Sequence, residues 1–568
     1  MAIPLDAGIG WLLTALSSAI IAAYEIVHMS GYSYPAGPAG SAYVISPFDE
    51  GVYAETGALI ARGFKLYSQI YSAQPPLLPL AISSVDRVFG AGLVEVRWLM
   101  LFFALVTAVG VLAIARLTVG LVAGGLAVML LALAPEFLVY AHAIEEEIPM
   151  IALSVVSLAL ALAWRRDRRI ELAAVSGLFF GLAVLTKFLA FALLAPLAVI
   201  VVLVAWEASK APAPGRRGQD PSVDDNPAKG LSSFDRQELI RVSRDAAMFV
   251  VGAAVPIVIS LLVWGQAEWN QMINDRLGAT ADQAQIQQGS SLHLLRIFLE
   301  VDPGLAIAAG VGAVALLLFD WRVGLILDSW LGATLLLLME YHPLFGHHLA
   351  VLLAPMAAVA GAGVGAAGAK IIGLLRRQNG FAGEKPRLRA RSGTVSRAQS
   401  IALVLAGLAT LAYVGLIPVK VPNYGNLLVG ESTGDRTLTR IAAFVKKSTF
   451  PNDQIAVADP MICVLAQRPC VPEMVDTSYV RVETGRLSPA ISYVLNANAS
   501  VVVLGRALCL HPYMDGFDQW IQSNYRLGLQ VALDAGLLGQ CPWQPGTRPV
   551  SPHGPAGVYV ARPAGTTS

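Results

Sequence analysis

Long runs of apolar residues recur along the chain, and no other feature constrains the fold as strongly. A helix needs about 20 mostly apolar residues to cross a bilayer. The sequence therefore predicts an α-helical polytopic membrane protein with about eleven transmembrane helices. The apolar run 171–206 is too long for one ordinary span, and we divide it into two predicted spans at Lys187. The predicted spans are 11–28, 98–115, 119–138, 148–164, 171–186, 188–206, 246–264, 303–319, 323–339, 348–367 and 399–419.

The composition agrees with a protein embedded in the lipid bilayer. Only 14% of the 568 residues are charged, whereas soluble domains average about 25%. The net charge of +1 gives no support to nucleic acid as a partner. Residues 1–10 lack the basic segment of a signal peptide, so we expect the first apolar segment to remain as a span.

Basic residues concentrate in alternate loops, and this pattern predicts the orientation. The basic loops surround Arg116, 165–169 and Arg322, and include the polar linkers 207–245 and 368–398. Short loops rich in Lys and Arg stay in the cytoplasm. We therefore expect a multi-pass cell-membrane protein with a cytoplasmic N-terminus and both linkers inside. Residues 420–568 would then lie outside.

The C-terminal region differs from the rest of the chain. Three short apolar segments, 454–458, 500–504 and 557–560, predict buried strands, and 435–447 and 513–525 predict helices. Together they indicate an extracytoplasmic α/β domain over 420–568. All the cysteines lie here, where an oxidising compartment would allow disulfides, although free buried thiols are the alternative. Of three possible connectivities we expect Cys463 with Cys470 and Cys509 with Cys541.

Two adjacent carboxylates, Asp49 and Glu50, open a predicted helix in the first external loop, 29–97. Ser46 can cap this helix, Pro47 suits its first position, and Gly63 would end it. Asp49 could simply compensate the helix dipole. Alternatively, it is a general base that deprotonates an acceptor hydroxyl, or a metal ligand, and Glu50 assists or orients it.

A second acidic corner, Glu145-Glu146-Glu147, opens a later span on the same predicted face. Three adjacent acids repel one another and need a cation, a metal or water. A solvated helix N-terminus would also favour them. Carboxylates from two loops, such as Asp49 and Glu147, would suit a divalent cation, Mg²⁺ or Mn²⁺.

Several cations are candidates for binding a phosphate. Lys187 interrupts an apolar run, where a charge is costly and usually partnered. It would either pair with a lipid phosphate or extend to the interface. A group of histidines precedes a late span and could bind a phosphate or a metal, while Arg62 could bind phosphate or anchor at the interface. These histidines are His342, His347 and His348.

The first loop contains an extended motif, Asp49-Glu50-Gly51-x-Tyr53, followed by Gly63, Tyr67 and Gln74-Pro75-Pro76-Leu77. This motif resembles the first-external-loop signature of GT-C glycosyltransferases, in the branch of dolichyl-phosphate-mannose protein mannosyltransferases and the bacterial aminoarabinose transferase of lipid A. Glu147-x-Pro149, the Lys187 step and the histidine loop before a span containing Pro355 fit the same layout.

This resemblance implies a transmembrane glycosyltransferase domain over 1–419 and a sugar donor carried on a polyprenyl phosphate. The acceptor would be an extracytoplasmic glycan, lipid or protein. Catalysis would rest on Asp49 with Glu146 or Glu147, because the family often has Asp at the position of Glu147. Tyr53, Tyr67 and Gln74 would line the cavity. Metal dependence varies within the family.

Two other functions compete with this one. A transporter or flippase of a lipid-linked or anionic substrate would use discontinuous helices and paired charges at mid-membrane. A non-catalytic sensor or assembly protein would bind a ligand through its external domain, and Asp49→Asn would leave such a function intact.

Overall fold

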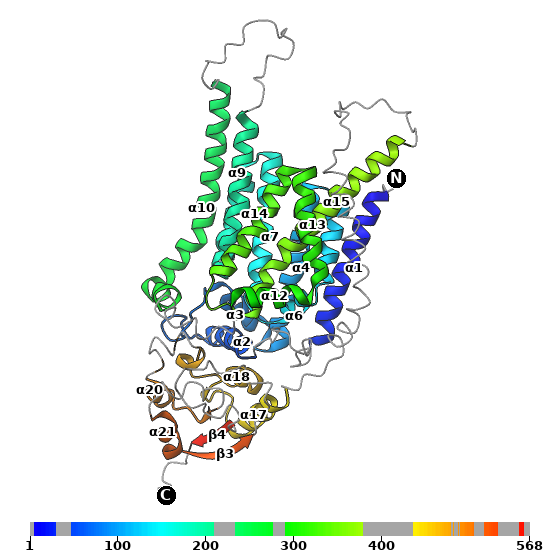
Figure 1. The fold of residues 1–568 in the computed structure, drawn as a ribbon. Helices are drawn as coiled ribbons and strands as arrows, with labels where there is room; N and C mark the ends of the chain where they lie inside the picture. Colours follow the sequence, from blue (N-terminus) through cyan, green and yellow to red (C-terminus); the bar gives the residue numbers. More distant parts are fainter. Residues whose placement is uncertain are drawn as a thin grey trace.

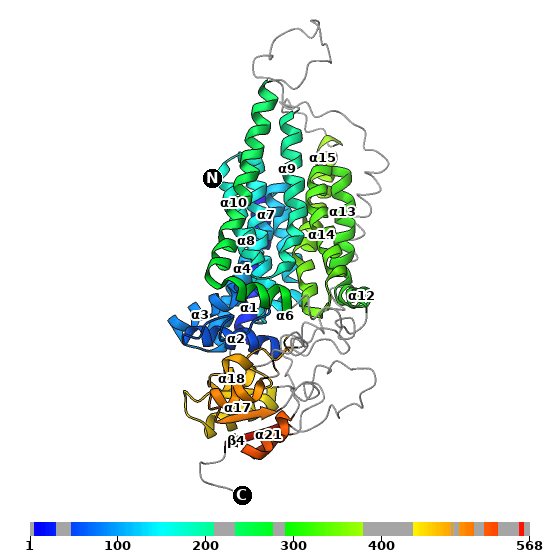
Figure 2. The same cartoon turned by 90° about the vertical axis from the view of Figure 1, so that its left-hand side faces the viewer.

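The computed structural model describes residues 5–29, 47–209, 233–275, 290–378, 435–478, 481, 487, 489–504, 516–531 and 556–561. A long helical bundle carries a small α/β unit at one end, and the first described residues lie toward the other end (Figure 1). The predicted fold class is therefore confirmed. Figure 2 shows the same two parts after a quarter turn.

Seven helical segments of the described residues are long and apolar enough to cross a membrane. Most correspond to predicted spans, while 399–419 lies outside the described residues, so the count of eleven stays a prediction. The segments are built from α1 (Leu5–His28), α4 (Leu93–Thr118), α7 (Glu147–Asp167), η1 (Phe188–Leu193) with α9 (Leu194–Ser209), α10 (Ser233–Trp269) with η2 (Asn270–Asn274), α14 (Trp321–Glu340), and η4 (Gly346–Leu352) with α15 (Leu353–Gln378).

Proline bends two further apolar segments. α5 (Leu121–Ala132) and α6 (Pro135–His142) meet at 71°, and α12 (Ser291–Val301) and α13 (Pro303–Phe319) meet at 101°. The residue before a proline avoids helical geometry, and Ala134 is accordingly extended. The predicted span 119–138 is thus a bent pair. α8 (Ile170–Val184) is a shorter apolar helix, and extended Lys187 separates it from η1.

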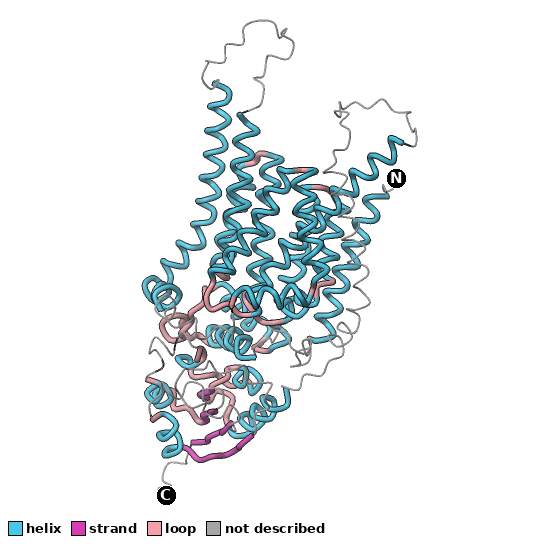
Figure 3. Tube along the Cα trace, viewed as in Figure 1, coloured by secondary structure: helices cyan, strands magenta, loops and turns pink. Residues whose placement is uncertain are grey.

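Two helices of the first loop lie across the end of the bundle that faces the α/β unit (Figure 1). They are α2 (Pro47–Ala61), which matches the helix predicted to open at Asp49, and α3 (Leu77–Phe89). Figure 3 shows loops gathered between the bundle and the α/β unit. α2 is therefore covered by membrane helices on one side and by the C-terminal unit on the other.

The C-terminal unit has a four-stranded sheet of order β1-β2-β4-β3, in which only β1 and β2 are parallel. Ile455 pairs with Val501, and Val502 pairs with Tyr559. Three strands were predicted, whereas β3 follows directly from a shorter helix than expected. The elements are α17 (Asp435–Ser448), β1 (Ile455–Val457), α18 (Met461–Ala466), η5 (Pro472–Met474), α20 (Ala490–Asn496), β2 (Val501–Leu504), α21 (Phe517–Asn524), β3 (Tyr525–Val531) and β4 (Ala556–Ala561).

The C-terminal unit packs directly on α2. Glu55 of α2 accepts a hydrogen bond from the Cys470 backbone N–H at 2.9 Å. Leu59 of α2 shares a buried apolar cluster with Val457 and Val501. Cys463 and Cys470 form a disulfide with a Cα–Cα distance of 5.6 Å, which is the first of the two expected pairs. Cys509 and Cys541, and the 419/420 domain boundary, lie outside the described residues.

Candidate active site

Acidic side chains from two loops meet at one histidine. Asp49 lies in the first turn of α2, Glu145 lies between α6 and α7, and His347 lies in η4. One potential ligand atom of each lies within 4.8 Å of the other two. The structure therefore brings the first-loop carboxylate to the second acidic corner, as the topology predicted. We call Asp49, Glu145 and His347 the acidic cluster.

A buried ion pair adjoins this cluster. The Lys187 ammonium donates a hydrogen bond to Glu147 Oε1, and both side chains are almost fully buried. His347 Nε2 lies 3.8 Å from the same oxygen. Lys187 thus pairs with a carboxylate inside the protein, as a charge in an apolar run requires. His348 is also near: Glu147, His347 and His348 form a second group of potential ligands within 4.8 Å.

Glu145 is buried without compensation. Neither of its carboxylate oxygens has a hydrogen-bond partner among the described residues. Burial raises the pKa of Glu145 well above its usual range, and the charges of Glu147 and Asp49 raise it further, while Lys187 opposes the shift. Buried polar groups are normally satisfied, so this carboxyl group is suited to hold a proton or face a bound cation.

Glu50 fixes the loop that carries Glu145. Its Oε1 accepts a hydrogen bond from the Ile144 backbone N–H at 2.8 Å. Burial raises the pKa of Glu50 to about 7, against the opposing effects of Arg97 and of this hydrogen bond. The expected orienting role of Glu50 therefore has a geometric counterpart, because it ties α2 to the residue before Glu145.

A buried polar pair that no sequence motif indicated lies where α6 leads into the loop that carries Glu145. Glu25 of α1 and His142 at the end of α6 are 2.9 Å apart, and both side chains are fully buried. The ring of His28 lies against that of Tyr24. Arg97 of α4 is also buried. The sequence did offer a signal for these residues. Glu25 and Arg97 are charges within or beside apolar spans, where burying a charge costs free energy, so such residues usually have a function or a partner.

The expected cavity residues separate into two places. Tyr53 is buried, and Asp49 and Glu145 to Glu147 act on it electrostatically. Tyr67 and Gln74 lie together elsewhere: the Tyr67 hydroxyl donates to the Gln74 carbonyl oxygen at 2.8 Å and touches Met272 near the end of α10. Glu146 is buried at the N-cap of α7, whereas Glu145 and Glu147 each belong to a group of potential ligands.

Two of the proposed phosphate-binding residues are not at the acidic cluster. Arg62 follows the far end of α2, about 20 Å along the helix axis from Asp49 at 1.5 Å per residue. There it lines a separate small cavity with Glu55 and Asp86. His342 is exposed, and its Nδ1 contacts the Glu340 carbonyl oxygen at 2.9 Å.

The donors present fit a divalent cation. The acidic cluster offers two carboxylates and one imidazole, and the neighbouring group offers Glu147 and two histidines. Glu147 is already paired with Lys187. In the cluster that contains Asp49, the second carboxylate is therefore Glu145 rather than the expected Glu147. A third group, Glu55 with Cys463 and Cys470, does not qualify because its sulfurs form a disulfide.

Known proteins share part of this sequence and the whole fold. Residues 73–213 match the family described as dolichyl-phosphate-mannose-protein mannosyltransferase. ArnT from Cupriavidus metallidurans bound to undecaprenyl phosphate has the same fold, with a TM-score of 0.55 and 16% sequence identity over 97% of this chain and 98% of that chain. The chain therefore shares the fold of ArnT, and about a quarter of it matches a mannosyltransferase family model. Apo ArnT matches the chain with a TM-score of 0.56 and 14% identity over the same shares. No curated protein sequence matches it.

Proposed function

We propose that this protein is a GT-C membrane glycosyltransferase that moves a hexosyl or pentosyl unit from a polyprenyl-phosphate donor to an extracytoplasmic acceptor. The convergence of Asp49, Glu145 and His347 beside the Lys187–Glu147 pair carries the proposal. The ArnT structure of the same fold holds undecaprenyl phosphate, which supports a donor of that class here.

Asp49 is the residue we assign as the base. Its side chain is half-buried in the first turn of α2, so it is partly desolvated yet accessible. It would take the proton of the acceptor hydroxyl as that oxygen attacks the anomeric carbon of the sugar. The bond from this carbon to the phosphate oxygen breaks at the same time. Phosphate leaves without a strong general acid, so positioning and charge stabilisation supply most of the catalysis.

Lys187 is the cation we expect beside the leaving phosphate, and the neutral His347 imidazole could donate a hydrogen bond to it. Both lie at Glu147, and an arriving phosphate would compete with this carboxylate for them. The positions of Arg62 and His342 give no support to the phosphate-binding role expected for them.

A divalent cation fits the acidic cluster. In this alternative role Asp49 would bind the ion together with Glu145 and His347 instead of acting as the base, and this mixture of carboxylates and imidazole suits Mn²⁺ better than Mg²⁺. When bound, such an ion would stabilise negative charge on an oxygen of the donor or the acceptor.

The competing transport function finds less support. A transporter places its broken helices at the bilayer midplane. In this chain the short arms α6 and α12 of the bent pairs lie at the end of the bundle that faces the α/β unit (Figure 1).

Asp49→Asn tests the proposed activity. Membranes containing the wild-type chain should transfer label from a radiolabelled polyprenyl-phosphate sugar, and the variant should lose nearly all of this transfer at equal expression. Asp167→Asn, an exposed carboxylate paired with Arg166 at the opposite end of the bundle, is the matched control and should transfer normally. Full transfer by Asp49→Asn would overturn the assignment.

A further inference from the structure

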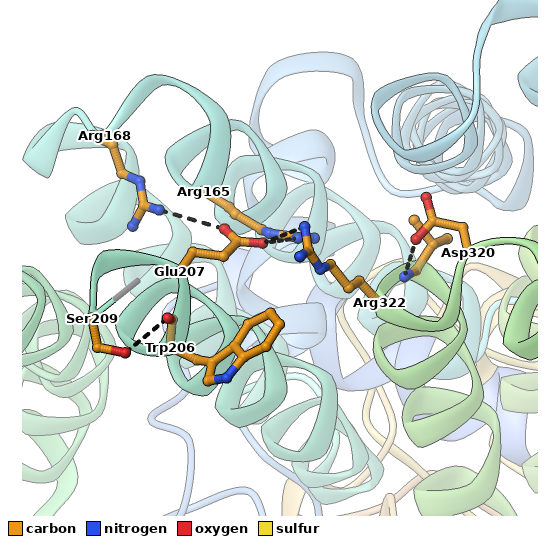
Figure 4. A network of polar contacts seen from close by, with 8 residues as sticks. Arg165, Arg168, Trp206, Glu207, Ser209, Asp320 and Arg322 are labelled. Carbon is orange, nitrogen blue, oxygen red and sulfur yellow. Dashed lines mark hydrogen bonds and ion pairs between the residues drawn. The ribbon is translucent and has the colours of Figure 1, made fainter. Parts of the chain in front are cut away.

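Four charged residues form a compact group at the end of the bundle opposite the acidic cluster (Figures 1 and 4). Arg165 lies in the last turn of α7, and Arg168 caps that helix. Glu207 lies near the end of α9, and Arg322 lies in the first turn of α14. We call Arg165, Arg168, Arg322 and Glu207 the arginine cluster. It draws on three candidate membrane spans and plays no part in the proposed chemistry.

One carboxylate holds all three guanidinium groups together. Glu207 Oε1 lies 2.7 Å from Arg165 and 3.5 Å from Arg322, and Oε2 lies 3.7 Å from Arg168 (Figure 4). The pairing leaves the arginines accessible, because 42% of the Arg322 side chain and 32% of the Arg168 side chain remain exposed. The cluster is thus prearranged and open to its surroundings.

The positive charge of the cluster exceeds what Glu207 can neutralise. Asp320 is nearby, but its carboxylate accepts from the Val323 backbone N–H as the cap of α14. Asp167 and Glu171 pair with Arg166 and Arg169 respectively. Arg322 Nε is buried with no hydrogen-bond partner in the described part of the chain. Glu238 also acts on Arg168, but it is paired with Arg241 at 3.8 Å. Three guanidinium groups against Glu207 therefore leave two positive charges for an anionic ligand.

Aromatic rings beside Arg322 favour a position for this surplus charge at the lipid–water boundary. The Arg322 guanidinium lies over the rings of Trp206 and Trp321, at 5.0 Å and 5.6 Å from their centroids. Tryptophan is enriched at the boundary between lipid and water, and stacking of this kind restrains a guanidinium group. All four charged residues also lie at ends of membrane-spanning helices.

We propose that the arginine cluster binds the phosphate-bearing headgroup of an anionic phospholipid. Basic pockets between membrane helices bind such headgroups, and arginine matches the geometry of phosphate oxygens. The phosphate displaces part of the Glu207 interaction and contacts Arg322 and Arg168, the more exposed of the three arginines.

Lipid retention by the purified full chain tests the site. The protein is incubated in detergent with cardiolipin, phosphatidylglycerol or phosphatidylcholine, and the retained lipids are counted by native mass spectrometry while unfolding temperature is followed. Cardiolipin and phosphatidylglycerol should be retained in preference to phosphatidylcholine. Arg322→Gln and Arg168→Gln should each weaken this retention roughly fivefold, the contribution of one basic residue near an anionic surface. Arg296→Gln, an exposed arginine paired with Glu300 on α12, is the matched control and should change nothing.

Glu207→Gln separates a lipid site from a purely structural ion pair. It removes the competing carboxylate, so a lipid site should retain anionic lipid roughly fivefold better. If the ion pair were purely structural, Glu207→Gln would instead lower the unfolding temperature of the protein without increasing the amount of lipid retained. That result would overturn the proposal. Displacement of cardiolipin by equimolar inorganic phosphate or by a polyprenyl phosphate would also overturn it, because the occupant would not be a phospholipid.

Discussion

Lys187 and Glu147 depend on each other because both are buried. Removing one partner of such a pair leaves an uncompensated charge, which costs about 3–5 kcal/mol. Glu147→Leu and Lys187→Met should therefore each lower the unfolding temperature of the purified protein strongly. The double variant Lys187→Met/Glu147→Leu should lose much less than the sum of the two. Additive losses in this double-mutant cycle would show that the pair is not coupled.

Glu55 should make stability depend on pH. Burial raises its pKa from 4.5 to about 8, and Asp86 adds to the rise, while Arg62 and the Cys470 N–H oppose it. The folded protein therefore binds this proton more tightly than the unfolded chain does. The resulting stability is present below pH 4.5 and is lost as the pH rises through about 8.

Glu55→Gln keeps a carbonyl oxygen for the Cys470 N–H and removes the titration. The unfolding temperature of this variant should fall less between pH 5 and pH 8 than that of the wild type. Glu300→Gln, at an exposed surface pair, should keep the wild-type slope. An unchanged slope in Glu55→Gln would assign the pH dependence to other groups.

The sequence could predict that Asp49 meets the second acidic corner, but not which glutamate it meets. Topology places both loops on one face, and that much follows from counting spans. Adjacent side chains leave the backbone in different directions, however, so only the three-dimensional structure separates Glu145, in the group with Asp49, from Glu147, which pairs with Lys187. No sequence motif could indicate the pairing of Glu25 with His142, because the two residues lie far apart in the chain.

At the scale of elements, Gly51 allows α2 to approach α18 closely. A Cβ atom on Gly51 would lie 2.3 Å from the Met461 backbone nitrogen. Alanine favours a helix over glycine by about 1 kcal/mol, but here overpacking of about 1–3 kcal/mol should prevail. Gly51→Ala should loosen the C-terminal unit, so that limited proteolysis removes it faster.

Gly332→Ala provides the matched control, because Gly332 also lies inside a helix but has open space where a Cβ would stand. This variant should resist proteolysis as well as the wild type. If Gly51→Ala were equally resistant, close approach of α2 and α18 would not hold the C-terminal unit in place.

The hydropathy of the sequence predicted the helices and strands whose side chains are mostly buried, and it missed the strand whose side chains are exposed. Most spans and the buried strands β1 and β2 carry continuous apolar runs. β3 is an edge strand in which Arg526 and Leu527 are exposed, so its residues give little apolar signal. The bend between α5 and α6 was also missed, because an apolar run shows no break where Pro135 redirects the chain.

At the scale of the whole molecule, the two ends of the bundle differ in charge. The arginine cluster lies at one end, and the acidic cluster, α2 and the disulfide-containing unit lie at the other (Figure 1). Basic residues remain on the cytoplasmic side. We therefore predict that the acidic cluster faces the outside, where the disulfide would be maintained.

Two single-cysteine reporters test this orientation in a background where Cys509 and Cys541 are replaced by serine. Glu300 lies on α12 at the acidic end, and Arg166 lies in the last turn of α7 at the arginine end; 59% and 65% of their side chains are exposed. Glu300→Cys should react with a membrane-impermeant maleimide in intact cells, and Arg166→Cys only after permeabilisation. The reverse pattern would place the acidic cluster in the cytoplasm. It would exclude an extracytoplasmic acceptor while leaving the geometry of the site unchanged.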